Sequence, residues 1–385
     1  MAMKNSLIGI EGVALIFLCC ISCIEPYDPP HIENGTGVLV VGGSLNAAGK
    51  STIRLTRTQN LDETKAVANE LKALVSFEDE GGRVFRLIEE GGGNYSLPAT
   101  SFDRSKQYRL TIKTSDSKEF ASAFVPIINT PPLDSISWKV AADNGVQVYV
   151  STHDPENKTR YYRWDYEESW SYVAAFNSRF DWKDGKVVLR TNNIYNCYRT
   201  LRSGKISIGS TANLNQAIIS NFPLLYMEQR SEKIRFKYSI LVKQYGITKE
   251  AYDYWLQLQN NTESLGTLFD PQPSQLTGNI GSTSNTSEPI IGYFTAEAIT
   301  EQRIFISSDF LARASSYITP FDGCSADTLM VQIIPLLRPK DLPTIILLES
   351  LPSGPGAITA YSASTLACAD CRSVGGTTTK PEFWQ

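Results

Sequence analysis

Apolar and polar residues alternate along most of the first third of the chain. Leu110, Thr111 and Ile112 are apolar, polar and apolar in turn, and similar stretches are separated by turns rich in glycine, aspartate and serine. A period of two residues is that of a strand with one buried face. Short strands at this spacing are typical of a β-sandwich. The pattern therefore predicts a first sandwich unit over residues 37–128.

A proline-containing linker ends this unit, and a second series of strands follows it. The linker "NTPPLDSI" spans residues 129–136, and the fixed backbone of proline stiffens it. In the later strand "RYYRWDYEE", one face carries Tyr162, Trp164 and Tyr166. The arrangement resembles a fibronectin type III domain and predicts a second β-rich unit over residues 133–385. We therefore expect a mainly β fold of two immunoglobulin-like or fibronectin III-like β-sandwich units.

The second unit is expected to contain a long insertion that carries one α-helix. In residues 249–261, "KEAYDYWLQLQNN", Tyr252 and Trp255 belong to an apolar stripe with the helical period. Thr248 directly precedes this stripe, in the position where threonine caps a helix N-terminus. An apolar stripe of this kind should pack on the sheet. The C-terminal third is predicted to consist of irregular connections stapled by cysteines.

A stretch near the N-terminus imitates a phosphate-binding loop. Gly49, Lys50 and Ser51 match the end of the motif G-x-x-x-x-G-K-[ST], but Ser44 stands where its first glycine is required. The motif must also lead into a helix, whereas "TIRLTRT" alternates as a strand does. We therefore predict a β-hairpin, with one strand over residues 37–43 and a return strand from Ser51.

The first 36 residues have the features of an export signal and a tether. Residues 1–23 contain Lys4 and then an apolar segment too short to span a membrane. Their end, "CISC", resembles a bacterial lipobox, which implies cleavage after Ser22 and lipidation of Cys23. Several acyl chains on one residue anchor a folded domain stably. Residues 24–36 are then a proline- and glycine-bearing tether to the membrane.

Cysteine usage agrees with an exported protein. Of the seven cysteines, three lie in residues 1–23 and the others are Cys197, Cys324, Cys368 and Cys371. An even number in an oxidising compartment predicts two structural disulfides, and the sequence does not choose among the three pairings. The segment "CADC" leaves two alternatives open, a thioredoxin-like redox pair and half of a zinc site. No strand–helix context supports the first, and no second ligand pair supports the other.

Composition limits the class of partner. The net charge is −4 and 42% of the residues are hydrophobic. The chain therefore has enough apolar side chains for a substantial core. It has no excess of basic residues with which to bind nucleic acid. We expect no nucleic-acid partner.

The sequence offers no convincing catalytic site. The two histidines are His31, in the tether, and His153, and no G-x-S-x-G motif supplies a serine nucleophile. The adjacent glutamates at 89–90 and 167–168 should point to opposite faces of their strands, so neither pair converges. A calcium site at residues 154–157, "DPEN", is an open alternative. We expect a protein that is not an enzyme and holds no cofactor.

Two segments are candidates for contact with a partner or ligand. The stretch "YYRWDYEESWSYVAAFNSRFDW" should mostly fill the core, but Trp170 and Trp182 lie beyond its regular strand. Exposed tryptophans offer large rigid faces to sugars and proteins. Residues 266–289 form a long loop rich in glycine, proline, serine, threonine and asparagine, and loops of this length are often functional. Within it we single out Phe269 and Asp270.

Several motifs occur in an order that resembles one bacterial family. After the lipobox come "EPYDP", "VVGGSL", "TKEAYDYWLQLQNN", "LFDPQPSQLTGNI" and the ending "CADCRSVGGTTTKPEFW". This order resembles the Bacteroidota lipoproteins grouped as domain of unknown function 4249, and the resemblance covers nearly the whole mature chain. Members are usually encoded near TonB-dependent outer-membrane receptors, and the family has no established catalytic residues.

The resemblance implies a location in the cell and a role. We expect a lipid-anchored outer-membrane protein, facing either the periplasm or the cell surface, that acts as a non-enzymatic accessory or binding partner of a TonB-dependent receptor. The alternative is a structural or adhesive surface lipoprotein with no transport role.

Overall fold

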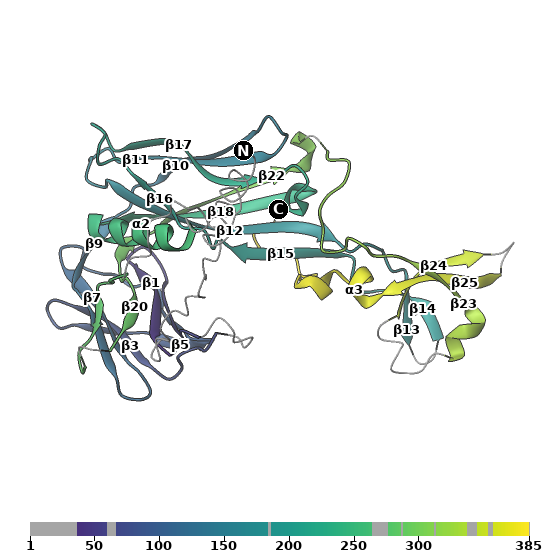
Figure 1. The fold of residues 1–385 in the computed structure, drawn as a ribbon, viewed down its shortest axis with the longest axis horizontal. Helices are drawn as coiled ribbons and strands as arrows, with labels where there is room; N and C mark the ends of the chain where they lie inside the picture. Colours follow the sequence, from purple (N-terminus) through teal and green to yellow (C-terminus); the bar gives the residue numbers. More distant parts are fainter. Residues whose placement is uncertain are drawn as a thin grey trace, which may run out of the picture.

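The computed structural model describes most of the chain after the tether. The described residues are 37–59, 67–183, 186–263, 276–285, 288–311, 313–336, 345–352 and 357–384. They form two β-sandwich units and a smaller sheet that projects from the second unit (Figure 1). The expectation of a mainly β fold is confirmed.

The first unit is a sandwich filled by large apolar side chains. Within the described residues, twelve strands form a continuous sheet in the order β19-β8-β7-β9-β21-β1-β2-β6-β5, with β3, β4 and β20 pairing beside it. Its early strands are β1 (Leu39–Asn46), β2 (Ser51–Arg57), β3 (Leu74–Asp79), β4 (Val84–Arg86), β5 (Ile88–Gly91), β6 (Asn94–Leu97), β7 (Gln107–Lys113), β8 (Glu119–Ser122) and β9 (Val125–Asn129). Leu110 and Ile112 are buried and Thr111 is not, as their alternation predicted.

The glycine-rich N-terminal stretch is a hairpin. Strands β1 and β2 pair antiparallel, so no helix follows Lys50. Gly43 has a φ of 109°, and a Cβ atom there would lie 2.1 Å from the carbonyl oxygen of Thr52, which only glycine avoids. The Lys50 ammonium lies 2.7 Å from the Glu90 carboxylate. The glycine and the lysine thus serve the hairpin and its surface, and the phosphate-loop interpretation is excluded.

Three strands from a late part of the chain complete the first unit. They are β19 (Ile280–Ser282), β20 (Ile290–Gly292) and β21 (Ala296–Ala298). β19 pairs antiparallel with β8, β20 pairs parallel with β1, and β21 pairs parallel with both β1 and β9. Phe294, between the last two strands, is fully buried in the first core. The sequence-based range of residues 133–385 therefore includes strands that hydrogen-bond to the first unit.

The second unit has one three-stranded and one larger antiparallel sheet. The first joins β10 (Leu133–Val140), β11 (Val146–His153) and β17 (Ile218–Met227), and the second joins β12 (Tyr161–Val173), β15 (Asn196–Arg202), β16 (Ser207–Ser210), β18 (Lys237–Ile247) and β22 (Thr300–Ser307). Tyr162 and Trp164 are fully buried between them. The Trp164 ring stacks 4.6 Å from that of Phe222, and its Nε1 donates to Gln244 Oε1 at 2.8 Å.

The predicted helix is present as α2 (Lys249–Glu263). The Thr248 hydroxyl accepts a hydrogen bond from the Ala251 N–H at 3.2 Å, which is the predicted cap. Ala251 and Tyr254 are buried on the face that packs against the sandwich. The ring of Tyr254 also lies 4.9 Å from that of Tyr293, in the segment leading to β21. The helix therefore lies beside the junction of the two units (Figure 1).

The C-terminal third is more regular than the sequence predicted. Its strands are β23 (Asp327–Met330), β24 (Ile345–Pro352) and β25 (Ile358–Thr365), which form an antiparallel sheet in the order β23-β25-β24. Beside it lies the hairpin of β13 (Phe180–Lys183) and β14 (Lys186–Leu189). The described residues also contain short helical segments, of which the first precedes β18: η1 (Glu232–Ile234), η2 (Ser308–Phe310), η3 (Val331–Leu336), α3 (Leu366–Ala369) and η5 (Cys371–Val374). The prediction of irregular connections here was wrong, because the consecutive strands β24 and β25 pair with each other and β23 adds to β25.

Candidate partner-binding site

The projecting sheet, here called the arm, combines two distant parts of the chain. It consists of the hairpin β13–β14, from the insertion after β12, and of β23, β24 and β25, which follow β22. The two parts are joined by hydrogen bonds: the Arg179 N–H donates to the Leu348 carbonyl at 2.9 Å, and the Ser178 hydroxyl donates to the Leu347 carbonyl at 2.7 Å. Figure 1 shows the arm extending away from both sandwiches.

The arm has a small hydrophobic core of its own. Ile334, Leu347, Tyr361 and Ala363 are its buried residues, and the hairpin packs side chains against them. The ring of Phe180 meets that of Tyr361 edge-on, with centroids 5.1 Å apart. So small a core stabilises the arm only weakly, because hydrophobic stabilisation scales with the apolar area removed from water.

Two disulfides connect the base of the arm to the second unit. Cys197, on β15, bonds to Cys371, and Cys324 bonds to Cys368. The cysteines of "CADC" therefore have different partners, and the alternative of a redox pair is wrong. The zinc alternative fails as well, because all four thiols are used and no group of three or more metal-ligating side chains occurs in the described parts of the chain. The predicted pair of structural disulfides is present.

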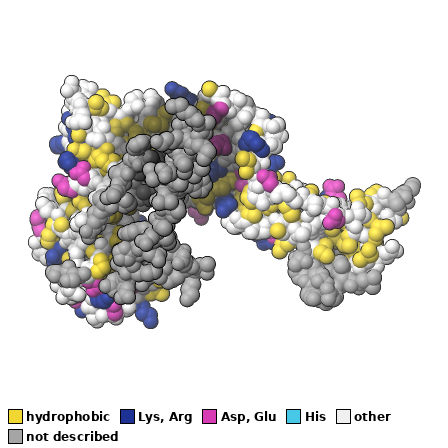
Figure 2. All heavy atoms as spheres, viewed as in Figure 1, with side chains coloured by type: hydrophobic (Ala, Val, Ile, Leu, Met, Phe, Trp, Pro, Cys, Tyr) yellow, Lys and Arg dark blue, Asp and Glu magenta, His cyan; other side chains and the backbone are white. Residues whose placement is uncertain are grey.

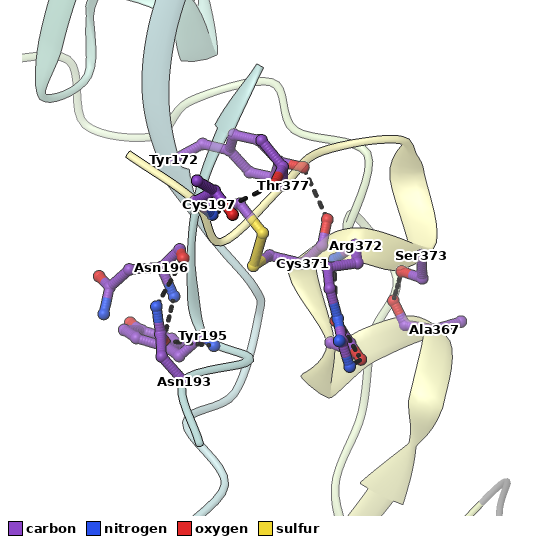
Figure 3. The surroundings of a disulfide bond; sticks show 12 residues. Tyr172, Asn193, Tyr195, Asn196, Cys197, Ala367, Cys371, Arg372, Ser373 and Thr377 are labelled. Carbon is purple, nitrogen blue, oxygen red and sulfur yellow. Dashed lines mark hydrogen bonds and ion pairs between the residues drawn. A yellow bond between two sulfur atoms is a disulfide. The ribbon is translucent and has the colours of Figure 1, made fainter. Parts of the chain in front are cut away.

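The environment of Cys371 shows how the base is held (Figure 3). The Tyr172 hydroxyl donates to the Cys371 carbonyl at 2.6 Å. Beyond the cysteine, Tyr198 and Thr377 exchange backbone hydrogen bonds of 2.8 and 3.0 Å, which attach the C-terminal segment to β15. The Asp370 carboxylate pairs with the Arg372 guanidinium at 2.6 Å. The arm therefore leaves the sandwich from a rigid, cross-linked base.

The two predicted contact tryptophans have different environments. Trp170 is only 3% exposed and lies in the core of the second unit, with its Nε1 donating to Glu232 Oε2 at 3.4 Å. It offers no face to a partner, because β12 runs longer than expected and keeps this side chain inward. Trp182 is half-buried on β13 in the arm. Phe269 and Asp270 lie outside the described residues, as does Cys23.

A cleft of about 410 Å³ opens where the arm meets the second unit. Its walls are mostly apolar and include the half-buried Trp182. Arg190 and Asp370 also line the cleft and place charged groups beside the apolar walls. Arg190 Nε donates to the Ser178 hydroxyl at 2.9 Å. The cleft thus combines an apolar surface with polar groups of fixed position, as protein-binding and ligand-binding sites do. Its main lining residues are Phe180, Trp182, Arg190, Ile194, Leu347 and Asp370.

The arm also exposes large apolar side chains to solvent. Leu189 is 68% exposed and Ile358 is 46% exposed, and Figure 2 shows hydrophobic side chains gathered along the arm. Other exposed apolar residues of the arm are Met330, Val331, Ile333, Leu351 and Leu366. Clustered exposed apolar side chains mark interaction surfaces. The sequence analysis did not identify this exposed apolar surface. The apolar run "TIILLES" could have indicated β24, one of the strands of the arm.

His153 forms a surface pair with a carboxylate. It lies at the end of β11, and its Nδ1 is 2.7 Å from a carboxylate oxygen of Asp134. Both side chains are substantially exposed, and no hydroxyl or thiol is hydrogen-bonded to the ring in the described structure. The pair lacks the nucleophile that a catalytic triad requires.

The remaining carboxylates are engaged in structure. Glu168 is buried and pairs with the Lys233 ammonium at 2.8 Å, whereas Glu167 faces the other way toward Arg303. The Asp154 carboxylate, the candidate calcium ligand, accepts backbone N–H bonds from the residues that follow it, including Thr159 at 2.7 Å. These acceptors are thus already used by a turn.

No helix among the described residues is long and apolar enough to cross a membrane.

Most of the chain matches one protein family. A family model described as "Domain of unknown function (DUF4249)" matches residues 24–303. The protein belongs to this family. The match covers both sandwiches and the hairpin of the arm, and it ends within β22. The strands β23, β24 and β25 and three of the four disulfide cysteines of this DUF4249 protein lie beyond it.

Solved structures show a likeness of fold alone. Three similar chains are a cytokine receptor complex, a segment of two fibronectin type III domains from chicken tenascin, and the FN1–FN3 domains of chicken CNTN1. They are 10%, 11% and 16% identical to this chain over 54% of its length. The alignments cover 90%, 90% and 62% of those chains, with TM-scores of 0.17, 0.17 and 0.19. No curated protein matches the sequence.

Proposed function

We propose that this DUF4249 protein is an outer-membrane lipoprotein, anchored through Cys23, that acts as a non-enzymatic partner of a TonB-dependent receptor. The arm is the surface that contacts the receptor. The observation that carries the proposal is the exposed apolar surface of the arm, since Leu189 is 68% exposed and Ile358 is 46% exposed. Large apolar side chains that a folded domain leaves in contact with water are typical of a surface that binds another protein.

The position of the arm supports the same role. The described chain begins at the first unit, which would lie next to the tether and its lipid. The first unit and the arm stand at opposite ends of the long axis of the molecule (Figure 1). The disulfide between Cys197 and Cys371 holds the base of the arm, so little conformational freedom is lost when the arm binds. A rigid arm held away from the anchor suits contact with a neighbouring membrane protein.

The test is a pull-down of the full-length protein, tagged after its last residue through a flexible linker, from native outer membranes in mild detergent. Mass spectrometry should identify a TonB-dependent receptor in stoichiometric amount. A variant with Leu189→Glu and Ile358→Glu should lose the receptor, because burying two carboxylates in an apolar interface is costly. The matched control is Ile88→Glu, since Ile88 is 65% exposed on the first unit.

The outcomes separate the two candidate functions. Loss of the receptor in the arm variant, with retention in the Ile88 control, supports the proposal. Recovery of the lipoprotein alone, from extracts in which the receptor is demonstrably present, contradicts it and favours a structural or adhesive surface lipoprotein. Equal recovery of the receptor by all variants would refute the arm as the contact surface.

A further inference from the structure

A second concave surface lies on the second unit, apart from the arm cleft. It is a pocket of about 530 Å³ between the segment that leads into β18 and the segment that follows β22. The residues that carry the argument line it from both sides: Arg235, Phe236, Ser308, Arg313, Ser316 and Tyr317. Two arginines, two aromatic rings and hydroxyl groups thus face one solvent-filled space.

Backbone hydrogen bonds hold the two walls of this pocket together. The Ser308 N–H donates to the Phe236 carbonyl at 2.8 Å, and the Ile318 N–H donates to the Arg230 carbonyl at 2.8 Å. A parallel bridge between Ser231 and Ile318 lies next to the second bond. The segment that carries Arg313 is therefore fixed against the segment that carries Arg235. Hydrogen bonds within the chain hold both walls of the pocket, so binding does not have to organise it.

The two arginines are available to an anion. The Arg235 guanidinium lies over the rings of Phe236 and Tyr317, 4.9 and 5.7 Å from their centroids. Stacking of this kind orients the guanidinium plane but leaves its N–H donors unused. Among the described residues, neither Arg235 nor Arg313 has a side-chain hydrogen bond or a carboxylate partner within ion-pair distance. Both guanidinium groups therefore have N–H donors that they can offer to an anion.

The surrounding groups favour a compact anion of high charge. Ser315 and Ser316 line the pocket and can donate hydroxyl hydrogen bonds. The carboxyl group of Glu232, three positions before Arg235 in the sequence, is buried and accepts from the Trp170 indole at 3.4 Å. Burial raises the pKa of the Glu232 carboxyl, which reduces its competition for Arg235. One guanidinium satisfies a single carboxylate in a bidentate pair, whereas two guanidinium groups match the charge and the oxygens of a phosphate.

We propose that this pocket binds the phosphate group of a phosphate-bearing small molecule, with Arg235 and Arg313 as its two cationic ligands. The serine hydroxyls supply neutral donors, and the ring of Tyr317 forms the apolar wall beside the phosphate. The phosphate group is carried by a sugar or by a lipid headgroup, which present the same chemistry to the arginines.

Isothermal titration calorimetry of the full-length protein in detergent tests the proposal. The probes are inorganic phosphate, glucose 6-phosphate, a water-soluble short-chain phosphatidic acid, and citrate as a non-phosphate anion. At least one phosphate probe should bind with a dissociation constant of about 1 mM or tighter, since each arginine adds charge-assisted hydrogen bonds. The preferred phosphate probe identifies the source, because only the phosphatidic acid carries acyl chains.

Variants distinguish the site from general charge. Arg235→Ala and Arg313→Ala should each weaken binding about tenfold or more, and the corresponding lysine variants less, because lysine keeps the charge but loses the planar donors. The matched control is Arg86→Ala, an exposed arginine on β4 of the first unit. Thermal unfolding midpoints of all variants should remain close to that of the parent protein.

Three results would overturn the assignment. The first is the absence of saturable binding of every phosphate probe. The second is binding that both alanine variants leave unchanged. The third is citrate binding more tightly than all the phosphate probes, which would assign the pocket to carboxylates.

Discussion

The two sandwiches and the arm are stabilised in different ways. Of the described residues, 20 buried side chains form the core of each sandwich, and only 4 form the core of the arm. The arm instead depends on covalent links at its base, where both disulfides lie. Small units with little apolar area to bury generally need such cross-links. The sandwiches are folded by their cores, whereas the arm is held in place by its attachment.

This difference has a consequence for function. A unit that does not bury its apolar residues internally can present them outside, as the arm does with Leu189. Each sandwich also exposes large apolar side chains, such as Ile88 and Phe310, but it does so beside a core of 20 buried residues, whereas the core of the arm has 4. The comparison yields four predictions, given from the largest effect to the smallest.

The largest effect is expected from removing the disulfide between Cys197 and Cys371. The bond closes a loop with a sequence separation of 174, and cross-linking so long a loop stabilises the folded state by about 5 kcal/mol in the chain-entropy model. Cys197→Ala with Cys371→Ala should therefore lower the free energy of unfolding of the second unit by several kcal/mol. Urea unfolding followed by near-ultraviolet circular dichroism would measure it.

The control for this experiment is the other disulfide. Cys324 and Cys368 have a sequence separation of 44, and Cys368 lies at the base of the arm. Their replacement by alanine should raise hydrogen exchange in β23, β24 and β25, and leave exchange in β11 and β17 unchanged. Protection lost equally across both sandwiches would show that the arm is not an independent unit.

The second effect concerns the aromatic core. Trp164 is fully buried and hydrogen-bonded to Gln244, so Trp164→Ala should destabilise the second unit by about 4 kcal/mol, through the cavity and the unpaired amide. Trp182, half-buried in the arm, is the matched control. Its replacement by alanine should cost less than half as much in the same urea unfolding experiment. Equal costs would contradict the view that the arm contributes little core.

The third effect arises at the junction of the two sandwiches. Glu297, on β21, is fully buried, with the side chains of Ser44 and Thr295 beside its carboxyl group. Facing it from β12 is Arg163, which lies 4.1 Å from the Tyr245 ring of β18 and pairs with Asp165 at 3.0 Å. Burial raises the pKa of Glu297 to about 7. The Ser44 hydroxyl and the Arg163 guanidinium lower this pKa, but they offset the effect of burial only in part.

The pH dependence follows from the direction of this shift. The unfolded chain loses the proton near pH 4.5, the ordinary value, while the folded protein keeps it until about pH 7. Stability is therefore full below pH 4.5, falls between these two values by about 3 kcal/mol, and stays at the lower level above them. Glu297→Gln should remove this fall, as measured by urea unfolding from pH 4 to pH 8. An unchanged pH profile in the variant would refute the assignment to Glu297.

The smallest effect on stability is expected at the exposed apolar surface of the arm. Leu189→Glu should change the free energy of unfolding by less than about 0.5 kcal/mol, because an exposed side chain contributes little to folding. Ile88→Glu on the first unit should behave in the same way, and urea unfolding of both variants would measure the two changes. A destabilisation of Leu189→Glu by more than about 2 kcal/mol would show that Leu189 belongs to the arm's own core.

The sequence predicted most of the local structure of both sandwiches. The alternation around Leu110 and the apolar face of Tyr162 and Trp164 were sufficient to predict strands that the structure contains. The Thr248 cap and the following stripe were sufficient to predict α2. These predictions succeed because hydrophobic periodicity and capping depend on residues within one or two turns of each other. The candidate site was predicted less well, since Trp170 is buried and only Trp182 of the two tryptophans lies in the arm.

The sequence was sufficient to predict strands and the helix of the two sandwiches, the hairpin in place of a phosphate loop, and the presence of two structural disulfides. Three-dimensional contacts were needed to show which cysteines pair, that β21 returns to lie between β1 and β9, and that β13 and β24 form one arm. The same is true of Arg235 and Arg313, which face one pocket although they lie 78 positions apart in the sequence. Short-range order is encoded by neighbours along the chain. Contacts between distant segments depend on the packing of the whole fold, and no local pattern carries that information.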